Sequence, residues 1–415
     1  MMREMKADIL VIGAGPAGLA AAQAAAAAGV ERVMIIDRLE EPGGILRQCI
    51  HHGFGLRYFG EELTGPEYAR RFIMMLDSEP RIELLTGAMA LELTPQREVI
   101  FATPALGMVR CRAGAVILAM GCRERPRGAV NIPGTRPAGV YSAGTAQRLM
   151  NIEGLRPGNR AVILGSGDIG LIMARRLTLE GIEVKAVLEL LPYSSGLARN
   201  IVQCLDDFGI PLLLGHTVTR ITGKRRVESV EAAPVTPDRR PVLERAFRMD
   251  CDTLVLSVGL IPEIELASGA GIRIDPSTGG PEVDSNYQTS VPGIFACGNV
   301  AHVHDLVDDV TVESQAAGKS AAAFTFGLES PISRVRIKPG RNVRSVAPQW
   351  IDRNRPALLY IRPLFPEMGR ALRVGNGLRK ERVVTPGETL RYQFKPEDLM
   401  PGTAELPVSI GEEEE

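Results

Sequence analysis

The sequence reads Asp8-Ile-Leu-Val-Ile-Gly-Ala-Gly-Pro-Ala-Gly18 near its start, and this stretch decides the fold. Its four consecutive apolar residues, 9–12, are typical of a strand that is buried on both faces. A Gly-x-Gly-x-x-Gly turn follows, and the alanine-rich residues 19–28 predict a helix. A second apolar run, residues 32–37, ends in a carboxylate, so the segment predicts a strand–turn–helix–strand unit.

The three glycines of this turn have the spacing of a turn that binds a dinucleotide. Gly13 permits the tight turn, Gly15 lets the backbone approach a pyrophosphate, and Gly18 lets the helix pack against the strand. The helix N-terminus offers unpaired N–H groups to the phosphates. Asp37 lies 19 positions after Gly18, close to the roughly 20 expected for an acid that binds a ribose hydroxyl.

The same pattern occurs a second time, in residues 160–189. A strand leads into Gly165-Ser-Gly167-Asp-Ile-Gly170, a helix is expected at 171–180, and the next strand ends at Glu189. Glu189 again lies 19 positions after the last glycine. One such motif is a weak signal, but two complete copies predict two dinucleotide sites.

Composition excludes several classes of protein. The 415 residues suggest two or three domains, and a net charge of −1 gives no reason to expect nucleic-acid binding. No apolar run reaches the roughly 18 residues of a membrane span, and residues 1–6 do not resemble a signal peptide. The six scattered cysteines form no C-x-x-C, which argues against a zinc site, an iron–sulfur cluster and a secreted disulfide framework and favours the cytoplasm.

Further elements are expected along the chain. Residues 64–78 predict a helix capped by Thr64, and residues 81–99 predict a small antiparallel meander. Strands are expected to end at Gly121, Gly259 and Gly298. A helix rich in small residues is expected from about Val310 to 326, with Asp308 and Asp309 just before it as caps.

The composition changes near residue 328. Residues 331–395 carry 15 lysines and arginines against 4 aspartates and glutamates, a net charge of +11. Proline and glycine divide the segment into short runs typical of strands. It predicts a small basic β-rich domain, residues 328–408, followed by an acidic tail at 409–415.

These motifs together resemble the two-dinucleotide flavoproteins that include thioredoxin reductase and glutathione reductase. The resemblance covers residues 6–327 and implies an α/β fold with two Rossmann-like domains, to which the small C-terminal β-rich domain would be added. The FAD domain would comprise residues 1–125 and 263–327, and the inserted NAD domain residues 126–262.

The resemblance also assigns cofactor-binding residues. Those implied for FAD are Gly13, Gly15, Pro16, Ala17, Gly18, Asp37, Arg38, Gly44, Ile45, Leu46, Ala119, Gly121, Gly298, Asn299 and Val310. Those implied for NAD(H) are Gly165, Gly167, Asp168, Ile169, Gly170, Glu189 and Gly259. Asn299 stands where the family has an acid, and it can still bind a hydroxyl as a neutral group. The helix near Val310 is expected to direct its positive end at the flavin.

The sequence departs from these reductases at their redox dithiols. At the positions that align with the C-x4-C of glutathione reductase, this chain has Leu46 and His51. At the positions that align with the C-x-x-C of thioredoxin reductase, it has Ala143 and Ala146. Disulfide reduction is therefore excluded as the main chemistry. Cys49 is interpreted as a structural or flavin-adjacent thiol.

A narrower resemblance is to flavoprotein subunits of opine oxidase, hydroxyproline dehydrogenase and hydrogen cyanide synthase, and to a flavoprotein associated with glycerol-3-phosphate dehydrogenase. It rests on residues 43–55, 61–68 and 298–307 and on the second glycine motif, and it implies the extra C-terminal domain. The hypothesis is an FAD-dependent oxidoreductase that exchanges electrons with NADH and with a partner dehydrogenase subunit or a small-molecule substrate. Glu189 favours NADH because a carboxylate repels a 2′-phosphate.

Two other functions compete with this hypothesis. The chain can be a docking subunit with no NADH activity of its own, bound to its partner through the basic C-terminal domain. A stand-alone amine or amino-acid oxidase is disfavoured by the second glycine motif. The candidate catalytic residues are Gln48, His51, His52 and His304; each histidine, with His302, alternatively only binds backbone in its loop.

Overall fold

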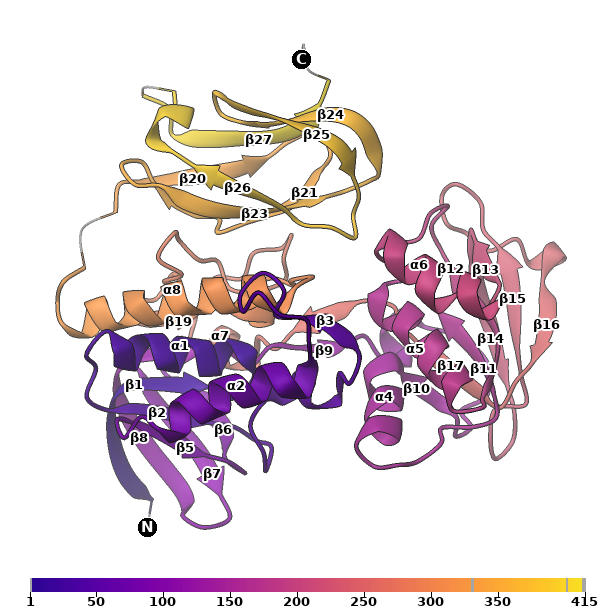
Figure 1. Ribbon diagram of the computed structural model, residues 1–415, viewed down its shortest axis with the longest axis horizontal. Coiled ribbons are helices and arrows are strands. Elements are labelled where there is room, and N and C mark those ends of the chain that lie inside the picture. Colours follow the sequence, from indigo (N-terminus) through magenta and orange to yellow (C-terminus); the bar gives the residue numbers. More distant parts are fainter. Residues whose placement is uncertain (1, 330–331, 401, 413–415) are drawn as a thin grey trace. The chain divides into compact units, whose positions relative to one another are not determined.

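The computed structural model describes residues 2–329, 332–400 and 402–412. The chain forms two compact units, one comprising Met1–Cys122 with Pro262–Glu415 and the other Arg123–Ile261 (Figure 1). The fold is mixed α/β with Rossmann-like sheets and a β-rich C-terminal region, as the sequence predicted. None of the helices among the described residues has the length and apolar character needed to cross a membrane.

The first unit is built on a sheet whose central strand leads into the first glycine turn. The strand order is β5-β2-β1-β8-β7-β6, with β19 beside β8. The strands are β1 (Arg3–Ile12), β2 (Val33–Ile36), β5 (Ile82–Leu85), β6 (Met89–Leu93), β7 (Glu98–Thr103), β8 (Gly107–Leu118) and β19 (Ile294–Ala296). Neighbouring strands are parallel except at β8–β7 and β7–β6. Residues 9–12 are buried, as expected for a strand covered on both faces.

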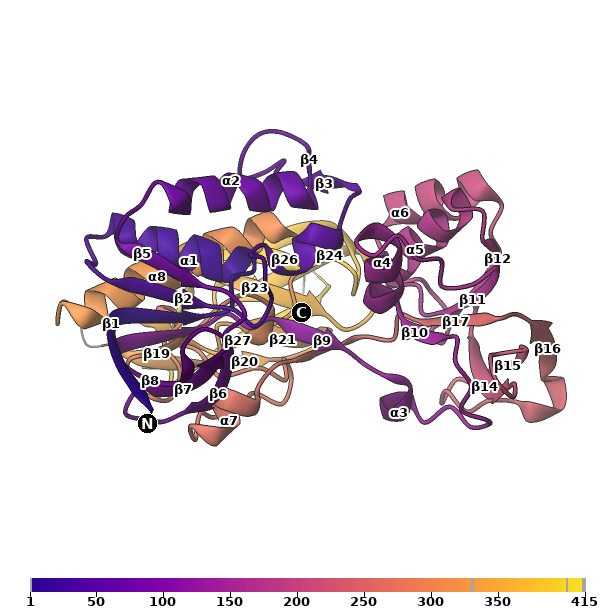
Figure 2. The ribbon, with the colours of Figure 1, turned by 90° about the horizontal axis from the view of Figure 1, so that it is seen from below.

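Helices cover this sheet closely because small residues line their contacts. The helices are α1 (Pro16–Ala27), α2 (Gly65–Asp77), α7 (Glu265–Gly269) and α8 (Val307–Thr325). α1 and α8 lie side by side along the sheet (Figure 1). Figure 2 shows α2 on the same side of the sheet as α1. Thr64 and Glu67 form the capping box that starts α2, which confirms the predicted cap.

The second unit repeats the same strand–turn–helix arrangement. Its parallel sheet has the order β10-β17-β11-β12-β13, and β14-β15-β16 form an antiparallel sheet. The strands are β10 (Val140–Ser142), β11 (Arg160–Leu164), β12 (Glu183–Glu189), β13 (Leu212–Leu214), β14 (His216–Thr222), β15 (Ser229–Pro234), β16 (Phe247–Asp250) and β17 (Thr253–Leu256). The helices are α3 (Arg127–Val130), α4 (Ala143–Asn151), α5 (Asp168–Leu179) and α6 (Ala198–Cys204). β11 leads directly into the second glycine turn, and α5 follows it.

Short strands complete the chain outside these sheets. They are β3 (His52–Phe54), β4 (Leu63–Thr64), β9 (Cys122–Glu124) and β18 (Leu260–Pro262).

The C-terminal region of the first unit contains two sheets that share one apolar core. One sheet has the order β22-β20-β27-β24-β25 and the other β21-β23-β26. The strands are β20 (Arg334–Pro339), β21 (Val343–Ala347), β22 (Trp350–Asp352), β23 (Ala357–Pro363), β24 (Glu367–Val374), β25 (Gly377–Val384), β26 (Leu390–Phe394) and β27 (Glu405–Gly411). Arg362 and Arg391 each lie 2.7 Å from a carboxylate, of Asp305 and Asp309 respectively. Two of the positive charges of this region are therefore paired with carboxylates of the same chain.

The structure corrects three local predictions. α8 begins at Val307, so Asp308 and Asp309 lie in its first turn, and no side chain caps the helix at Leu306. Residues 82–85 do not belong to a meander, because β5 pairs in parallel with β2. The acidic tail does not begin at residue 409, since β27 continues to Gly411; residues 413–415 of that predicted tail lie outside the described residues.

Candidate functional site: two glycine turns and a buried histidine cluster

The first glycine turn leaves the N-terminus of α1 open to a ligand. Gly15 is the N-cap residue, and no side chain caps the helix there. A Cβ added at Gly15 would have no heavy atom nearer than 4.0 Å, the Cα of Gly44. A Cβ added at Gly18 would lie only 1.7 Å from the carbonyl oxygen of Gly13. The turn therefore combines close internal packing at Gly18 with only an ordinary van der Waals contact beside Gly15, as expected of a turn that binds a pyrophosphate.

Asp37 holds the turn in shape. One carboxylate oxygen of Asp37 accepts the N–H of Ala14 at 2.6 Å, and the other accepts the N–H of Leu39 at 2.8 Å. Each carboxylate oxygen has a second lone pair, which remains suited to a ribose hydroxyl. Its neighbour Arg38 is exposed and lies 3.7 Å from the carboxylate of Glu263.

Two segments distant in sequence lie against this turn. Gly44 follows Gly43 in a 3₁₀ turn (Gly44–Gln48), and a Cβ on Gly44 would lie 2.9 Å from the Cα of Gly15. A Cβ on Gly298 would lie 2.7 Å from the Cβ of Ala17 and 3.4 Å from Cγ1 of Val310. The structure thus brings together the first turn, Gly44, Gly298 and the start of α8. The family resemblance assigns all of them to FAD binding.

The other residues predicted to bind FAD differ in their burial and in their contacts. Ala119 donates its N–H to the carbonyl of Ile12, and its own carbonyl lies against Gly13. Gly121 has nothing within 4 Å of an added Cβ. Leu46 is buried and Ile45 is exposed. The side-chain oxygen of Asn299 accepts the N–H of His304 at 3.0 Å, which fixes the loop after Gly298.

The second turn has the same construction. A Cβ on Gly170 would lie 2.4 Å from the carbonyl oxygen of Gly165, whereas a Cβ on Gly167 would have its nearest heavy atom, Oγ of Ser195, at 3.8 Å. Glu189 is buried, and its carboxylate accepts the N–H and hydroxyl of Ser166 at 2.9 and 2.6 Å. The acid at the end of the second strand again orients the glycine turn.

Asp168, predicted to bind NAD(H), also has partners within the chain. Its carboxylate, at the first position of α5, accepts the N–H of Leu197 at 2.8 Å and the side-chain amide of Asn200 at 2.7 Å. The side chain thus ties the start of α5 to the start of α6. Next to it Ile169 is half-buried, and an added Cβ on Gly259 would have nothing within 4 Å.

The candidate catalytic residues near Gly44 lie in different environments. Gln48 is buried, the ring of His51 lies 5.0 Å from that of Phe54, and His52 is exposed on β3. Their catalytic assignment stays a prediction.

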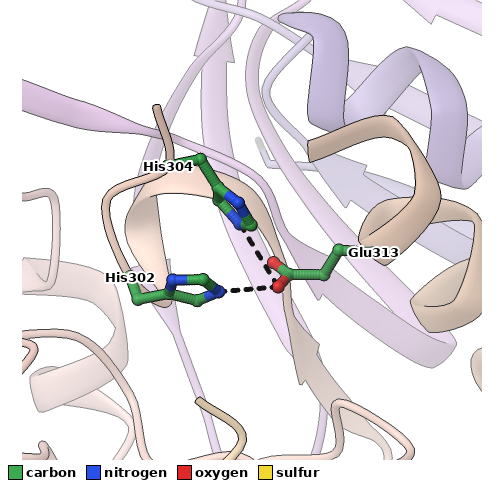
Figure 3. A group of neighbouring side chains, drawn as sticks. All are labelled: His302, His304 and Glu313. Carbon is green, nitrogen blue, oxygen red and sulfur yellow. Dashed lines mark hydrogen bonds and ion pairs between the residues drawn. The ribbon is translucent and has the colours of Figure 1, made fainter. Parts of the chain in front are cut away.

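His304 belongs to a buried cluster that the sequence did not reveal. Nε2 of His302 lies 2.7 Å and Nε2 of His304 3.2 Å from the same carboxylate oxygen of Glu313, on α8 (Figure 3). Burial alone would raise the pKa of Glu313, but His304 and His302 outweigh it and hold that pKa well below its usual range. Burial and the neighbouring His304 lower the pKa of His302. A lone glutamate in an alanine-rich helix carries no signal of this pairing.

Five of the six cysteines are buried. None of the six cysteines, all of which are described, is paired in a disulfide. Burial raises the pKa of Cys49 and Cys297 to about 12, and that of Cys111 and Cys251 to about 11. The pKa of Cys204 is also raised by burial.

We therefore expect iodoacetamide to label the native protein at half-buried Cys122 far faster than at any other cysteine. Near pH 8 a thiol of pKa 12 is thiolate in only about one molecule in ten thousand, and burial also blocks the reagent. Mass spectrometry of timed samples measures each site, with the unfolded protein as the control in which all six react. Labelling of Cys49 as fast as Cys122 would contradict the buried, unreactive assignment.

The fold and these two turns define a protein with two dinucleotide-binding units, each with an open helix N-terminus and an acid at the end of the second strand. The chain belongs to the pyridine nucleotide-disulphide oxidoreductase family, whose model matches residues 7–321. This family consists of flavoprotein oxidoreductases that bind FAD and NAD(P).

Individual proteins of known name share less than a third of their aligned residues with this chain. The chain is 28% identical over 313 residues to an opine oxidase subunit of Agrobacterium tumefaciens (strain Ach5), covering 71% of this chain and 61% of that protein. It is 27% identical over 357 residues to the alpha subunit of sarcosine oxidase from Rhizobium meliloti (strain 1021), covering 83% and 33%. The chain thus spans less than two thirds of the length of each. The fold of T. acidophilum thioredoxin reductase matches with a TM-score of 0.62 at 22% identity, covering 78% of this chain and 99% of that one.

Proposed function

We propose that the chain is an FAD-dependent oxidoreductase that exchanges electrons between NADH and a partner subunit or a small acceptor, without a redox disulfide. One observation carries this proposal: an added Cβ at Gly15 or Gly167, each the N-cap residue of a helix, would meet no atom nearer than 3.8 Å, while neither dithiol of the related reductases is present in the sequence. FAD, when bound, supplies a group that takes up and releases two electrons.

The residues that would hold FAD all lie in the first unit. The N–H groups at the start of α1 would bind the pyrophosphate, and Asp37 the ribose of the adenosine half. Asn299 lies beside Gly298 and would bind a hydroxyl of the remaining chain as a neutral amide. The start of α8 lies near Gly298, since Cγ1 of Val310 is 3.4 Å from where a Cβ on Gly298 would be, and this supports the proposed role of the positive helix end at this site.

The preference for NADH over NADPH rests on Glu189. Its buried carboxylate lies at the end of β12, where the second ribose would bind, and it would repel a 2′-phosphate. Residues 190–193 contain no arginine to receive such a phosphate. Equal activity with NADPH and NADH would contradict this preference.

A partner subunit is supported by the names of the relatives, which are subunits of oxidases. The basic C-terminal region would bind an acidic surface of that partner. Arg362 and Arg391 are paired within the chain, but Arg344 and Arg382 are exposed and available for this contact. The unpaired thiols support a reducing compartment such as the cytoplasm.

One observation favours the second candidate, a flavin-binding docking subunit with no NADH activity. The carboxylate of Asp168 lies at the helix N-terminus where the pyrophosphate of NADH would bind, and two like charges there repel each other. Its hydrogen bonds to Leu197 and Asn200 reduce this repulsion by holding the side chain toward α6.

Gly167→Ala tests which candidate is right. We expect the variant to fold and keep FAD, because the new Cβ has no neighbour within 3.8 Å. It should need about tenfold more NADH for the same rate of flavin bleaching, a loss of about 1.4 kcal/mol in binding, since the Cβ lies where the pyrophosphate must approach. Anaerobic stopped-flow absorbance measures this rate.

The matched control is Gly128→Ala, at an exposed helical position of the same unit where a Cβ meets nothing within 4 Å. It should bleach like the wild type. If the wild-type protein contains FAD but NADH does not bleach it, the docking subunit is the right assignment.

A further inference from the structure

Three side chains with metal-ligating atoms meet under the C-terminal region of the first unit. His302 and His304 come from the loop after Gly298, and Glu313 comes from the second turn of α8 (Figure 3). One nitrogen from each histidine and one oxygen from Glu313 lie within 4.8 Å of one another. The side chains are almost fully buried, with 8%, 2% and 0% of their surfaces exposed.

Hydrogen bonds among the three do not satisfy all of their polar atoms. His302 Nε2 lies at hydrogen-bond distance, 2.7 Å, from Oε2 of Glu313. His304 Nε2 is also buried and lies 3.2 Å from the same oxygen, an ion-pair distance without the geometry of a regular hydrogen bond. Two ring nitrogens and one carboxylate oxygen thus face one another in a buried cluster.

We propose that His302, His304 and Glu313 bind a divalent transition-metal ion, with Zn²⁺ as the representative. Two imidazole nitrogens and one carboxylate oxygen form a ligand set that such ions prefer over calcium or magnesium. A tetrahedral ion at about 2.0–2.1 Å from each ligand keeps those atoms about 3.3 Å apart. The His304–Glu313 separation of 3.2 Å already meets this, and the His302 ring would move outward by about 0.6 Å.

The surroundings orient the proposed ligands. The second oxygen of Glu313 accepts the N–H of Gly298 at 2.7 Å, which fixes the carboxylate as outer-shell hydrogen bonds do in metal sites. The ring of Tyr360, on β23, packs 5.2 Å from His302 and 5.0 Å from His304. The positive charge of Arg362 opposes a metal ion, but Asp305 neutralises it at 2.7 Å.

The ion would join the loop after Gly298 to α8 beneath Tyr360, and so stabilise one wall of the proposed FAD site. The sequence alone does not predict a metal here, because the two histidines are two apart and the glutamate is nine residues further on. The proposal does not depend on NADH activity, since it rests on three side chains of the first unit alone.

The full-length, FAD-loaded protein is first treated with EDTA to remove metal ions. Zn²⁺ is then titrated into it in a calorimeter, and elemental analysis measures the zinc that remains bound. We expect one equivalent of Zn²⁺ with a Kd of about 1 µM or tighter. His304→Ala and Glu313→Gln should each weaken binding by at least about 100-fold, because each removes a ligand. His216→Ala, which removes a histidine of the second unit, is the matched control and should bind like the wild type.

Co²⁺ in place of Zn²⁺ identifies the ligands by spectroscopy even if a variant fails to fold. Visible d–d bands without a thiolate charge-transfer band in the wild-type protein indicate a nitrogen and oxygen site. A thiolate band would place the ion on a cysteine and overturn the proposal. So would a wild-type protein that binds no stoichiometric Zn²⁺, or a folded His304→Ala variant that binds as tightly as the wild type.

Discussion

Gly18→Ala is expected to lower the free energy of unfolding of the first unit by about 3 kcal/mol and to abolish retention of FAD. The new Cβ would lie 1.7 Å from the carbonyl oxygen of Gly13 and 2.9 Å from its carbonyl carbon. Backbone atoms cannot rotate away as a side chain can, so α1 must shift from β1, and forced overpacking of this kind costs about 1–3 kcal/mol or more. The shift also moves the N–H groups at the start of α1, which would bind the pyrophosphate.

Urea denaturation followed by circular dichroism measures the stability loss, and flavin absorbance of the purified protein measures the FAD content. Gly269→Ala is the control for stability, because an added Cβ there has nothing within 4 Å. Gly15→Ala separates folding from binding: with its nearest neighbour at 4.0 Å, it should fold normally yet retain less FAD. A Gly18→Ala protein with wild-type stability and full FAD would show that the turn does not need the close approach.

The parts of the fold that the sequence predicted are those encoded locally. Residues 9–12 and the glycines at 13, 15 and 18 specify a buried strand and a tight turn within one short segment, and the second copy repeats that information. Thr64 and Glu67 likewise predict their own capping box. The ends of elements are encoded less sharply: α1 begins at Pro16 rather than at residue 19, because proline suits the first helical position.

What the sequence did not reveal depends on partners far away in the chain. Asp308 and Asp309 read as helix caps because acids often occupy that position. In the folded protein Asp309 instead pairs with Arg57 and Arg391, and the pairing of Glu313 with two histidines depends on the path of the loop after Gly298. A buried carboxylate has no local sequence signature, since its burial becomes favourable only when distant donors reach it.

Asp308 is the clearest case, and its removal should release the loop that carries the predicted flavin-side histidines. Its buried carboxylate accepts the N–H of Gly55 at 3.2 Å and that of Tyr58 at 2.8 Å, joining segments about 250 residues apart. Asp308→Ala leaves both N–H groups without this acceptor, at about 1–3 kcal/mol for each buried group. We expect a total loss of about 3 kcal/mol in the free energy of unfolding.

Asp308→Asn is the matched variant, because it keeps the size of the side chain and one acceptor oxygen but loses the charge. It should lose about half as much stability as Asp308→Ala, since hydrogen bonds to a neutral acceptor are about half as strong as those to a carboxylate. Trypsin provides an independent measurement of the loop, because Arg57 lies between the two amides that Asp308 holds. Cleavage after Arg57 should be fastest in Asp308→Ala, intermediate in Asp308→Asn and slowest in the wild type. Equal urea midpoints and equal cleavage rates in all three proteins would contradict the prediction. Contacts other than those of Asp308 would then hold the loop that follows His51 and His52.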